Sequence, residues 1–227
     1  MVRLVLLDIE GTTLPITFVK DVMFPYAARA LPTVLEEQAE PVVIKARADI
    51  EAAFPGRAPL DVCRDWMARD EKAAPLKALQ GVAWRQGFAD GTIRADLYAD
   101  VLPALQAWHD AGLRLAVYSS GSIPSQKLLY GHTVQGDVTG LFEGFYDLST
   151  GGKKDADSYR KIAVAAGVAP QDILFLSDIG AELDAAIEAG YAVCQLVRAQ
   201  DGTVPHPGVP QAATLGEVAQ NFDLLGA

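Results

Sequence analysis

The first residues that suggest chemistry lie directly after a short apolar run near the start of the chain. Asp8 ends the run VRLVLLD, and Glu10, Gly11 and Thr12 follow it. A carboxylate can attack phosphorus and carry the phosphoryl group as an acyl phosphate, while a second carboxylate acts as general acid and base. The turn that Gly11 and Thr12 predict would expose backbone amides to phosphate oxygens. Taken alone, however, the same motif is more typical of a helix cap or a turn.

Three later positions carry further polar side chains of matching chemistry. Ser119 and Ser120 follow LAVY, Lys153 and Lys154 lie in STGGKKDADSY, and Asp178 ends DILFLSD. Small hydroxyls can bind phosphate oxygens, a lysine can neutralise a phosphate and its nucleophile, and a carboxylate oxygen suits Mg²⁺. Because a carboxylate and a phosphate repel, a divalent cation is needed to bring them together. Separately, such serines more often begin a helix, and such lysines are more often solvated.

A parallel sheet would bring these positions to one edge. Apolar runs occupy about residues 2–8, 113–122, 172–180 and 191–198, and helical patterns such as residues 101–112 separate them. Strands that alternate with helices predict an α/β fold with a mainly parallel, Rossmann-like sheet flanked by helices. Active sites in such folds lie outside the carboxyl ends of the strands. The sequence therefore predicts one site that contains Asp8, the serine pair and Asp178.

A long segment between the first two strands has a different character. Residues 19–97 show amphipathic helical patterns broken by prolines and glycines, with no clear strand. They predict an inserted all-helical cap domain, so that residues 1–18 and 98–227 form the catalytic α/β core. The Pro- and Gly-rich stretch AQDGTVPHPGVPQAA predicts a loop, and LGEVAQNF after it predicts a short final helix.

Composition limits the partners. The chain has 227 residues, half of them hydrophobic, and a formal net charge of −10. Such an acidic chain repels nucleic acid and anionic membrane surfaces. No apolar stretch reaches the roughly 18 residues of a membrane span, and no signal-peptide pattern is present. Cys63 and Cys194 lack metal-ligand spacing and predict buried free thiols. We expect a cytoplasmic monomer that binds neither nucleic acid nor membrane.

The order of the motifs supports a family resemblance. Asp-x-Glu-Gly-Thr, Ser-Ser-Gly-Ser, Gly-x-Lys and Ser-Asp resemble the four motifs of the haloacid dehalogenase superfamily. More narrowly, DIEGTTLPITFVKDVMFPYA, YSSGSIPSQKLLYGHT, GGKKDADSYRKIA and ILFLSDIGAELDAA resemble the enolase-phosphatase, or acireductone synthase, family of methionine salvage. ALQGVAWRQGF resembles that family's cap segment. The likeness covers nearly the whole chain and weakens after about Arg198.

This resemblance implies a function and a set of site residues. Members of the family use Mg²⁺ to enolise 2,3-diketo-5-methylthiopentyl-1-phosphate, a small phosphorylated metabolite, and then remove its phosphate through an aspartyl-phosphate intermediate. The implied catalytic residues are Asp8 as nucleophile, Glu10 as acid–base group, and Lys153. The implied metal ligands are Asp8, Glu10, chiefly through its backbone carbonyl, and Asp178. The implied substrate-binding residues are Ser119, Ser120 and Lys153.

Some assignments stay open at this stage. Lys153 is preferred to Lys154 because it fits the Gly-x-Lys spacing from Gly151. Glu10 is the candidate for removing the proton in the enolisation. Glu182 either holds a metal-bound water or steadies its loop, or it is a solvated acid on a helix face, and the two interpretations have similar weight.

The substrate pocket and the reaction class also have alternatives. Phe18, Phe24, Trp84 and Phe88 could read the methylthio end, but at least two of them are expected to be cap core. The role of His132 stays open between a structural one near the site and, with less weight, a catalytic one. The alternative functions are another phosphatase for a small molecule, such as phosphoglycolate or a sugar phosphate, a non-catalytic binding module, and a dehalogenase. The long match through the cap argues against another phosphatase. The presence of Asp8 and Asp178 argues against a binding module, and the metal site predicted from Glu10 and Asp178 argues against a dehalogenase.

Overall fold

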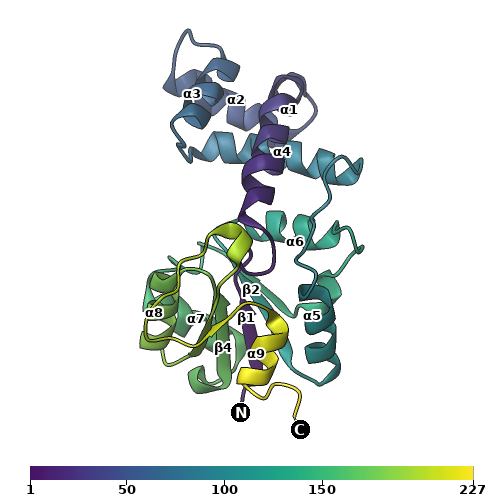
Figure 1. The fold of residues 1–227 in the computed structure, drawn as a ribbon. Coiled ribbons are helices and arrows are strands. Elements are labelled where there is room, and N and C mark those ends of the chain that lie inside the picture. The colour runs from purple at the N-terminus through teal and green to yellow at the C-terminus, as the bar shows by residue number, and fades with distance from the viewer. Residues whose placement is uncertain (227) are drawn as a thin grey trace. The chain divides into compact units, whose positions relative to one another are not determined.

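The computed structural model describes residues 1–226 and divides the chain into two compact units (Figure 1). One unit combines residues 1–18 with the chain from residue 95 onward, and the other consists of residues 19–94. The second junction therefore falls before Ala95, whereas the sequence places it after Leu97. The roles of the two units as catalytic core and cap stay predictions.

The first unit contains a six-stranded sheet in the order β3-β2-β1-β4-β5-β6. All of its strand pairs are parallel, which confirms the predicted Rossmann-like sheet. The strands are β1 (Leu4–Leu7), β2 (Arg114–Tyr118), β3 (Gly144–Tyr146), β4 (Ile173–Ser177), β5 (Ala192–Leu196) and β6 (Gln211–Ala212).

Two of these strands escape sequence-based prediction. The side chains of β3 are half-buried, and β6 has only two residues, within the stretch expected to be a loop. Neither presents the continuous apolar run that identifies a strand buried on both faces. The prediction of a loop was therefore wrong at Gln211 and Ala212.

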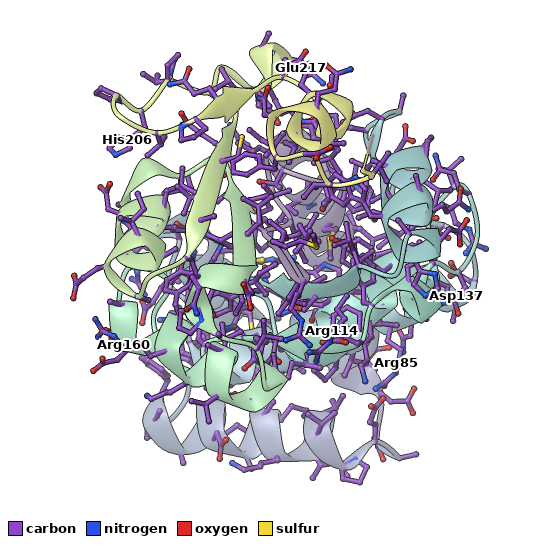
Figure 2. All side chains as sticks on the ribbon, turned by 90° about the horizontal axis from the view of Figure 1, so that it is seen from below. Arg85, Arg114, Asp137, Arg160, His206 and Glu217 are labelled. Carbon is purple, nitrogen blue, oxygen red and sulfur yellow. The ribbon has the colours of Figure 1, made fainter. Side chains whose placement is uncertain are left out.

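Helices cover both faces of this sheet (Figure 1). In the first unit they are α5 (Val101–Asp110), α6 (Ile123–Gly131), α7 (Ala156–Ala166), α8 (Gly180–Glu188) and α9 (Leu215–Asn221), with short 3₁₀ turns η2 (Thr139–Leu141), η3 (Pro170–Asp172) and η4 (Ala199–Asp201). Leu4 and Leu6 pack with Tyr159 of α7 and Leu183 of α8 in one apolar cluster. Charged side chains such as Arg160, Asp137 and Glu217 lie at the periphery (Figure 2).

The register of the sheet sets the position of the candidate site. Leu7, the last residue of β1, lies level with Val117 of β2 and Leu176 of β4. Asp8 directly follows β1, and Ser177 is the last residue of β4. The Asp8 amide donates to the Leu176 carbonyl at 2.9 Å. Asp8 thus leaves the centre of the sheet, between the strands that carry the other predicted site residues. The strand order reverses at β1 and β4, where ligands bind in open α/β sheets.

The second unit is helical throughout. The π-helix η1 (Phe18–Met23) crosses into it and is followed by α1 (Phe24–Glu36), α2 (Pro41–Ala53), α3 (Pro59–Ala68) and α4 (Ala74–Ala89). Each α-helix has a proline in its first turn, where the missing N–H costs no helical hydrogen bond. Gly87 lets α4 approach α1 closely, since a Cβ there would lie 2.6 Å from the Tyr26 ring.

Two further sequence expectations have outcomes here. Cys63 and Cys194 are buried free thiols, as predicted, and burial raises the pKa of Cys63 to about 11. Within residues 1–226, no helix is long and apolar enough to cross a membrane.

An ion pair between buried Arg198 and half-buried Asp100 joins distant parts of the first unit. The Arg198 guanidinium contacts both carboxylate oxygens of Asp100, at 2.9 and 3.1 Å, and donates to the carbonyls of Thr12 and Ala213. It also stacks on the Tyr98 ring, with its carbon 4.2 Å from the ring centroid. Arg198 therefore ties the segment after β5 to the start of α5 and to the turn that follows Asp8.

We expect Arg198→Met to lower the free energy of unfolding of the first unit by about 3 kcal/mol, because half-buried Asp100 and the carbonyls of Thr12 and Ala213 all lose this donor. Urea denaturation measures the change. Arg160→Met, which removes an exposed ion pair with Asp157, is the control and should change little. A double variant, Arg198→Met with Asp100→Leu, should lose less than Arg198→Met alone. An equal or larger loss would show that the pair itself is not the source of the effect.

Candidate active site

The Lys153 ammonium lies between two buried carboxylates. Its Nζ is 2.6 Å from Asp8 Oδ1 and 2.7 Å from Glu182 Oε2, and all three side chains are buried. Burial lowers the pKa of Lys153, but the charges of Asp8 and Glu182 outweigh this effect and raise it overall. The lysine therefore stays protonated and compensates the negative charge beside Asp8.

Glu182 belongs to the site, so the interpretation as a solvated helix-face acid was wrong. It lies in the first turn of α8, and its Oε2 accepts a hydrogen bond from Ser177 Oγ at 3.0 Å. Burial and the Asp8 charge raise the pKa of Glu182, against the effect of Lys153. The Ser177 hydroxyl also lies 3.4 Å from Asp8 Oδ2 and accepts from the Ile179 amide. Ser177 was missed because, in the sequence, it is one small residue at the end of an apolar run.

Tyrosines hold the loop that carries Lys153. The Tyr159 hydroxyl donates to the Lys153 carbonyl at 2.7 Å, and the Tyr118 hydroxyl donates to the Gly151 carbonyl at 2.9 Å. The two rings pack edge to face. Lys154 is exposed, so the structure places Lys153 and not its neighbour beside Asp8. The loop is thus anchored to β2 and α7 on both sides of Gly152.

Asp178 meets the Asp8 turn at Gly11. A Cβ on Gly11 would lie 2.5 Å from Asp178 Oδ2, and Gly11 has a φ of +69°, so both space and backbone conformation require glycine. Burial, followed by the charge of Asp8, raises the pKa of Asp178 to about 7. Within residues 1–226, no lysine, arginine or histidine forms an ion pair with this carboxylate. A buried carboxylate of this kind is suited to act as a ligand of a bound cation.

The turn after Asp8 does not offer the expected amides. The Gly11 amide donates to the Leu14 carbonyl at 2.8 Å, and the amides of Thr12, Thr13 and Leu14 all approach the Ile9 carbonyl, at 2.9–3.2 Å. Gly11 and Thr12 are also buried. The prediction that these amides are free to bind phosphate was wrong, because the turn uses them to close on itself.

The two serines of the predicted pair differ in their exposure to solvent. Ser119 is buried at the end of β2; its amide donates to the Tyr146 carbonyl at 3.2 Å, and its Oγ accepts from the Gly121 amide at 3.2 Å. Ser120 is exposed. The turn therefore presents one hydroxyl from within the protein and one toward solvent.

The donors near Asp8 fit a divalent cation. The carboxylates of Asp8 and Asp178 leave neighbouring strands, and Glu10 is half-buried within the turn between Ile9 and Leu14. Among residues 1–226, no group of three His, Cys, Asp or Glu side chains is arranged to hold a metal ion. Two carboxylates with one backbone carbonyl are nevertheless the hard oxygen donors that Mg²⁺ takes, with water and phosphate completing its shell.

The four aromatic candidates for a pocket have different environments. Phe88 is fully buried within the second unit, which fits the interpretation as cap core, whereas Phe18, also buried, belongs to the first unit. Phe24 is 40% exposed and contacts Trp84 edge to face at 5.9 Å, while Trp84 Nε1 donates to the Met23 carbonyl. His132 Nδ1 lies 2.9 Å from the Leu128 carbonyl, one turn back in α6.

Comparison with known proteins gives consistent results. Residues 2–190 match the family of haloacid dehalogenase-like hydrolases. Enolase-phosphatase E1 of Gluconobacter oxydans (strain 621H) is 70% identical over 224 residues, 99% of each chain. Enolase-phosphatase E1 of Gluconacetobacter diazotrophicus is 59% identical over 97% of this chain and 94% of the relative. The crystal structure of the UTR4 protein of Saccharomyces cerevisiae is similar with a TM-score of 0.82 and 30% identity, covering 96% of this chain and 100% of that one.

We expect Asp178→Asn to stabilise the metal-free protein at pH 8 by roughly 1 to 3 kcal/mol, and by clearly less at pH 5, where only part of the loss has occurred. The folded-state pKa of about 7 lies above the ordinary aspartate value. The folded state therefore holds the proton more tightly, and this contribution is fully present below the unfolded-state pKa and lost as the pH rises through about 7. Asparagine cannot ionise, so the variant avoids the loss.

Urea denaturation in EDTA at the two pH values measures the difference. Asp223→Asn, at an exposed position, is the control and should shift neither value. Equal stabilisation by Asp178→Asn at pH 5 and pH 8 would contradict the titration of this carboxyl group.

Proposed function

The chain belongs to the enolase-phosphatase family of haloacid dehalogenase-like hydrolases, and on this premise we propose that it enolises and dephosphorylates 2,3-diketo-5-methylthiopentyl-1-phosphate in methionine salvage. The observation that carries the proposal is the buried Asp8 carboxylate, which leaves the central strand beside Lys153 and Asp178. This arrangement provides a nucleophile, a fixed positive charge and a cation ligand in one place.

We assign the dephosphorylation to Asp8, and its contact with Lys153 supports this assignment. One carboxylate oxygen attacks the phosphorus, and the bond between the phosphorus and the substrate oxygen breaks as the aspartyl phosphate forms. Glu10 donates a proton to the departing oxygen, then accepts one from the water that hydrolyses the acyl phosphate. Lys153 compensates negative charge on the transferring group, since its Nζ lies 2.6 Å from the nucleophile.

The enolisation requires removal of a proton beside a carbonyl group. We assign this step to Glu10, which is half-buried and follows the nucleophile closely. Ser119, Ser120 and Lys153 bind the oxygens of the enediolate and the phosphate, with the buried ammonium offsetting the charge that develops. Glu182 and Ser177 orient Lys153 through the 2.7 Å and 3.0 Å contacts they make.

The proposed cofactor is Mg²⁺. The carboxylates of Asp8 and Asp178 and the backbone carbonyl of Glu10 would hold it. When bound, the ion supplies Lewis-acid polarisation of substrate oxygens. The position of Asp178 supports this assignment, because its buried carboxylate meets the Asp8 turn at Gly11 and, within residues 1–226, forms no ion pair with a basic side chain.

The remaining expectations concern the cap and the partners. We propose that residues 19–94 act as the cap, which excludes water and contacts the apolar end of the substrate. We also propose a cytoplasmic monomer that binds neither nucleic acid nor membrane, which the net charge of −10 supports.

The decisive experiment combines the purified protein, the diketone phosphate and Mg²⁺. Inorganic phosphate and the ultraviolet absorbance of the enol product are followed together, with and without EDTA. The proposal expects both signals, and expects chelation to stop both. Phosphate release from sugar phosphates or phosphoglycolate alone would retain the nucleophile but overturn the substrate assignment.

We expect Asp8→Asn to reduce phosphate release by more than about a thousandfold, because the amide cannot form the acyl phosphate. Circular dichroism should show an unchanged fold, since Lys153 keeps its contact with Glu182. Lys154→Met, at the exposed neighbour of Lys153, is the control and should keep full activity. Substantial turnover by Asp8→Asn would remove Asp8 as nucleophile.

A further inference from the structure

Two buried glutamines form hydrogen bonds with the backbone of the two turns that carry the predicted site residues Ser119, Ser120 and Asp178. Gln126 of α6 and Gln195 of β5 are each 1% exposed, and each amide group donates to two backbone carbonyls. We propose that both are positioning residues: Gln126 sets the serine turn that binds substrate oxygens, and Gln195 sets the Asp178 turn that binds the metal ion. The roles of these turns rest on the proposed function.

Gln126 fixes both ends of the serine turn. Its Nε2 lies 2.7 Å from the Gly121 carbonyl, directly after Ser120, and 2.8 Å from the Tyr146 carbonyl at the end of β3. The Ser119 amide donates to the same Tyr146 carbonyl at 3.2 Å. The Tyr146 carbonyl thus accepts hydrogen bonds from both the Ser119 amide, at the start of the turn, and the Gln126 amide group, which binds Gly121 at its end.

Gln195 holds the backbone of Asp178. It pairs with Ser177 in the register of β4 and β5, which brings its side chain to the next residue. Its Nε2 donates to the Asp178 carbonyl at 2.9 Å and to the Val204 carbonyl at 3.0 Å, and its Oε1 accepts from the His206 amide at 2.7 Å. One bond reaches the turn of Asp178 and the other two reach the loop that precedes β6, so Gln195 joins the turn to the loop.

The chemistry of these positions specifically requires an amide. An apolar side chain would leave two backbone carbonyls at each site without that donor, and an ionised glutamate has no hydrogen to donate. Within residues 1–226, Gln126 Oε1 has no hydrogen-bond partner although it is buried. The bonds of its Nε2 are therefore what the side chain contributes to the turn.

The two residues should act on different ligands. Displacing the Asp178 backbone moves the proposed metal ligand but leaves the serine turn in place. Displacing Gly121 moves the serine turn but leaves Asp178 in place. A purely structural role would lower stability and leave both binding constants unchanged, or change them together. Separate effects on Mg²⁺ and phosphate would identify positioning.

Isothermal titration calorimetry tests this with two probes, Mg²⁺ alone and inorganic phosphate at saturating Mg²⁺. Gln195→Met should weaken Mg²⁺ binding about tenfold or more, as loss of a residue that orients a metal ligand does. Gln126→Met should weaken phosphate binding about tenfold and leave Mg²⁺ binding within about twofold. Gln211→Met is the matched control, because this exposed glutamine bonds the His206 carbonyl but not Asp178, and neither constant should change.

Glutamate variants cover the case in which the methionine variants do not fold. Gln126→Glu and Gln195→Glu keep the shape and lose the amide donor, so the same separation is expected. Unchanged constants in both folded variants, or equal changes in both, would overturn the positioning roles. Because neither probe is the diketone phosphate, a wild-type protein that binds both but does not convert that substrate would overturn the proposed substrate alone.

Discussion

The contact of one ammonium group with two buried carboxylates organises the candidate site. Asp8, Lys153 and Glu182 come from segments far apart in the chain, and their charged atoms meet at 2.6 and 2.7 Å in the interior. Burial of an unpaired charge costs several kcal/mol, so removal of the lysine would leave two acids that cannot both remain ionised. The arrangement therefore requires all three segments to be correctly folded before the Asp8 carboxylate has its compensating charge.

The rest of the first unit maintains that contact. The parallel sheet brings Asp8 out between β2 and β4, tyrosines fix the loop of Lys153, and Ser177 orients Glu182. Arg198 binds the carbonyl of Thr12 from the other side. Apart from Arg198, these supporting groups are neutral hydrogen-bonding residues, which keeps the charge at the site confined to the acids and the lysine.

Much of this could be predicted from the sequence, for a definite physical reason. Asp8, Ser119 and Asp178 each follow a buried apolar run, so the ends of parallel strands identify them without knowledge of the fold. Ser177, Gln126 and Gln195 could not be found this way, and the role of Glu182 stayed open, because their positions depend on which strands are neighbours and in what register. The closed turn at Gly11 also depends on local hydrogen bonds that composition does not specify, and β3 and β6 are too short or too exposed to show a pattern.

The close approach of Gly11 to the Asp178 carboxylate has a consequence for how such a site can diverge. Only a hydrogen atom fits between the two turns, so Gly11 cannot gain a side chain while Asp178 stays in place. Exposed Ser120 is not enclosed in this way, so a change in its size meets fewer neighbouring atoms. A change of specificity on this scaffold would then begin at exposed positions such as Ser120, around a turn at Gly11 that cannot enlarge.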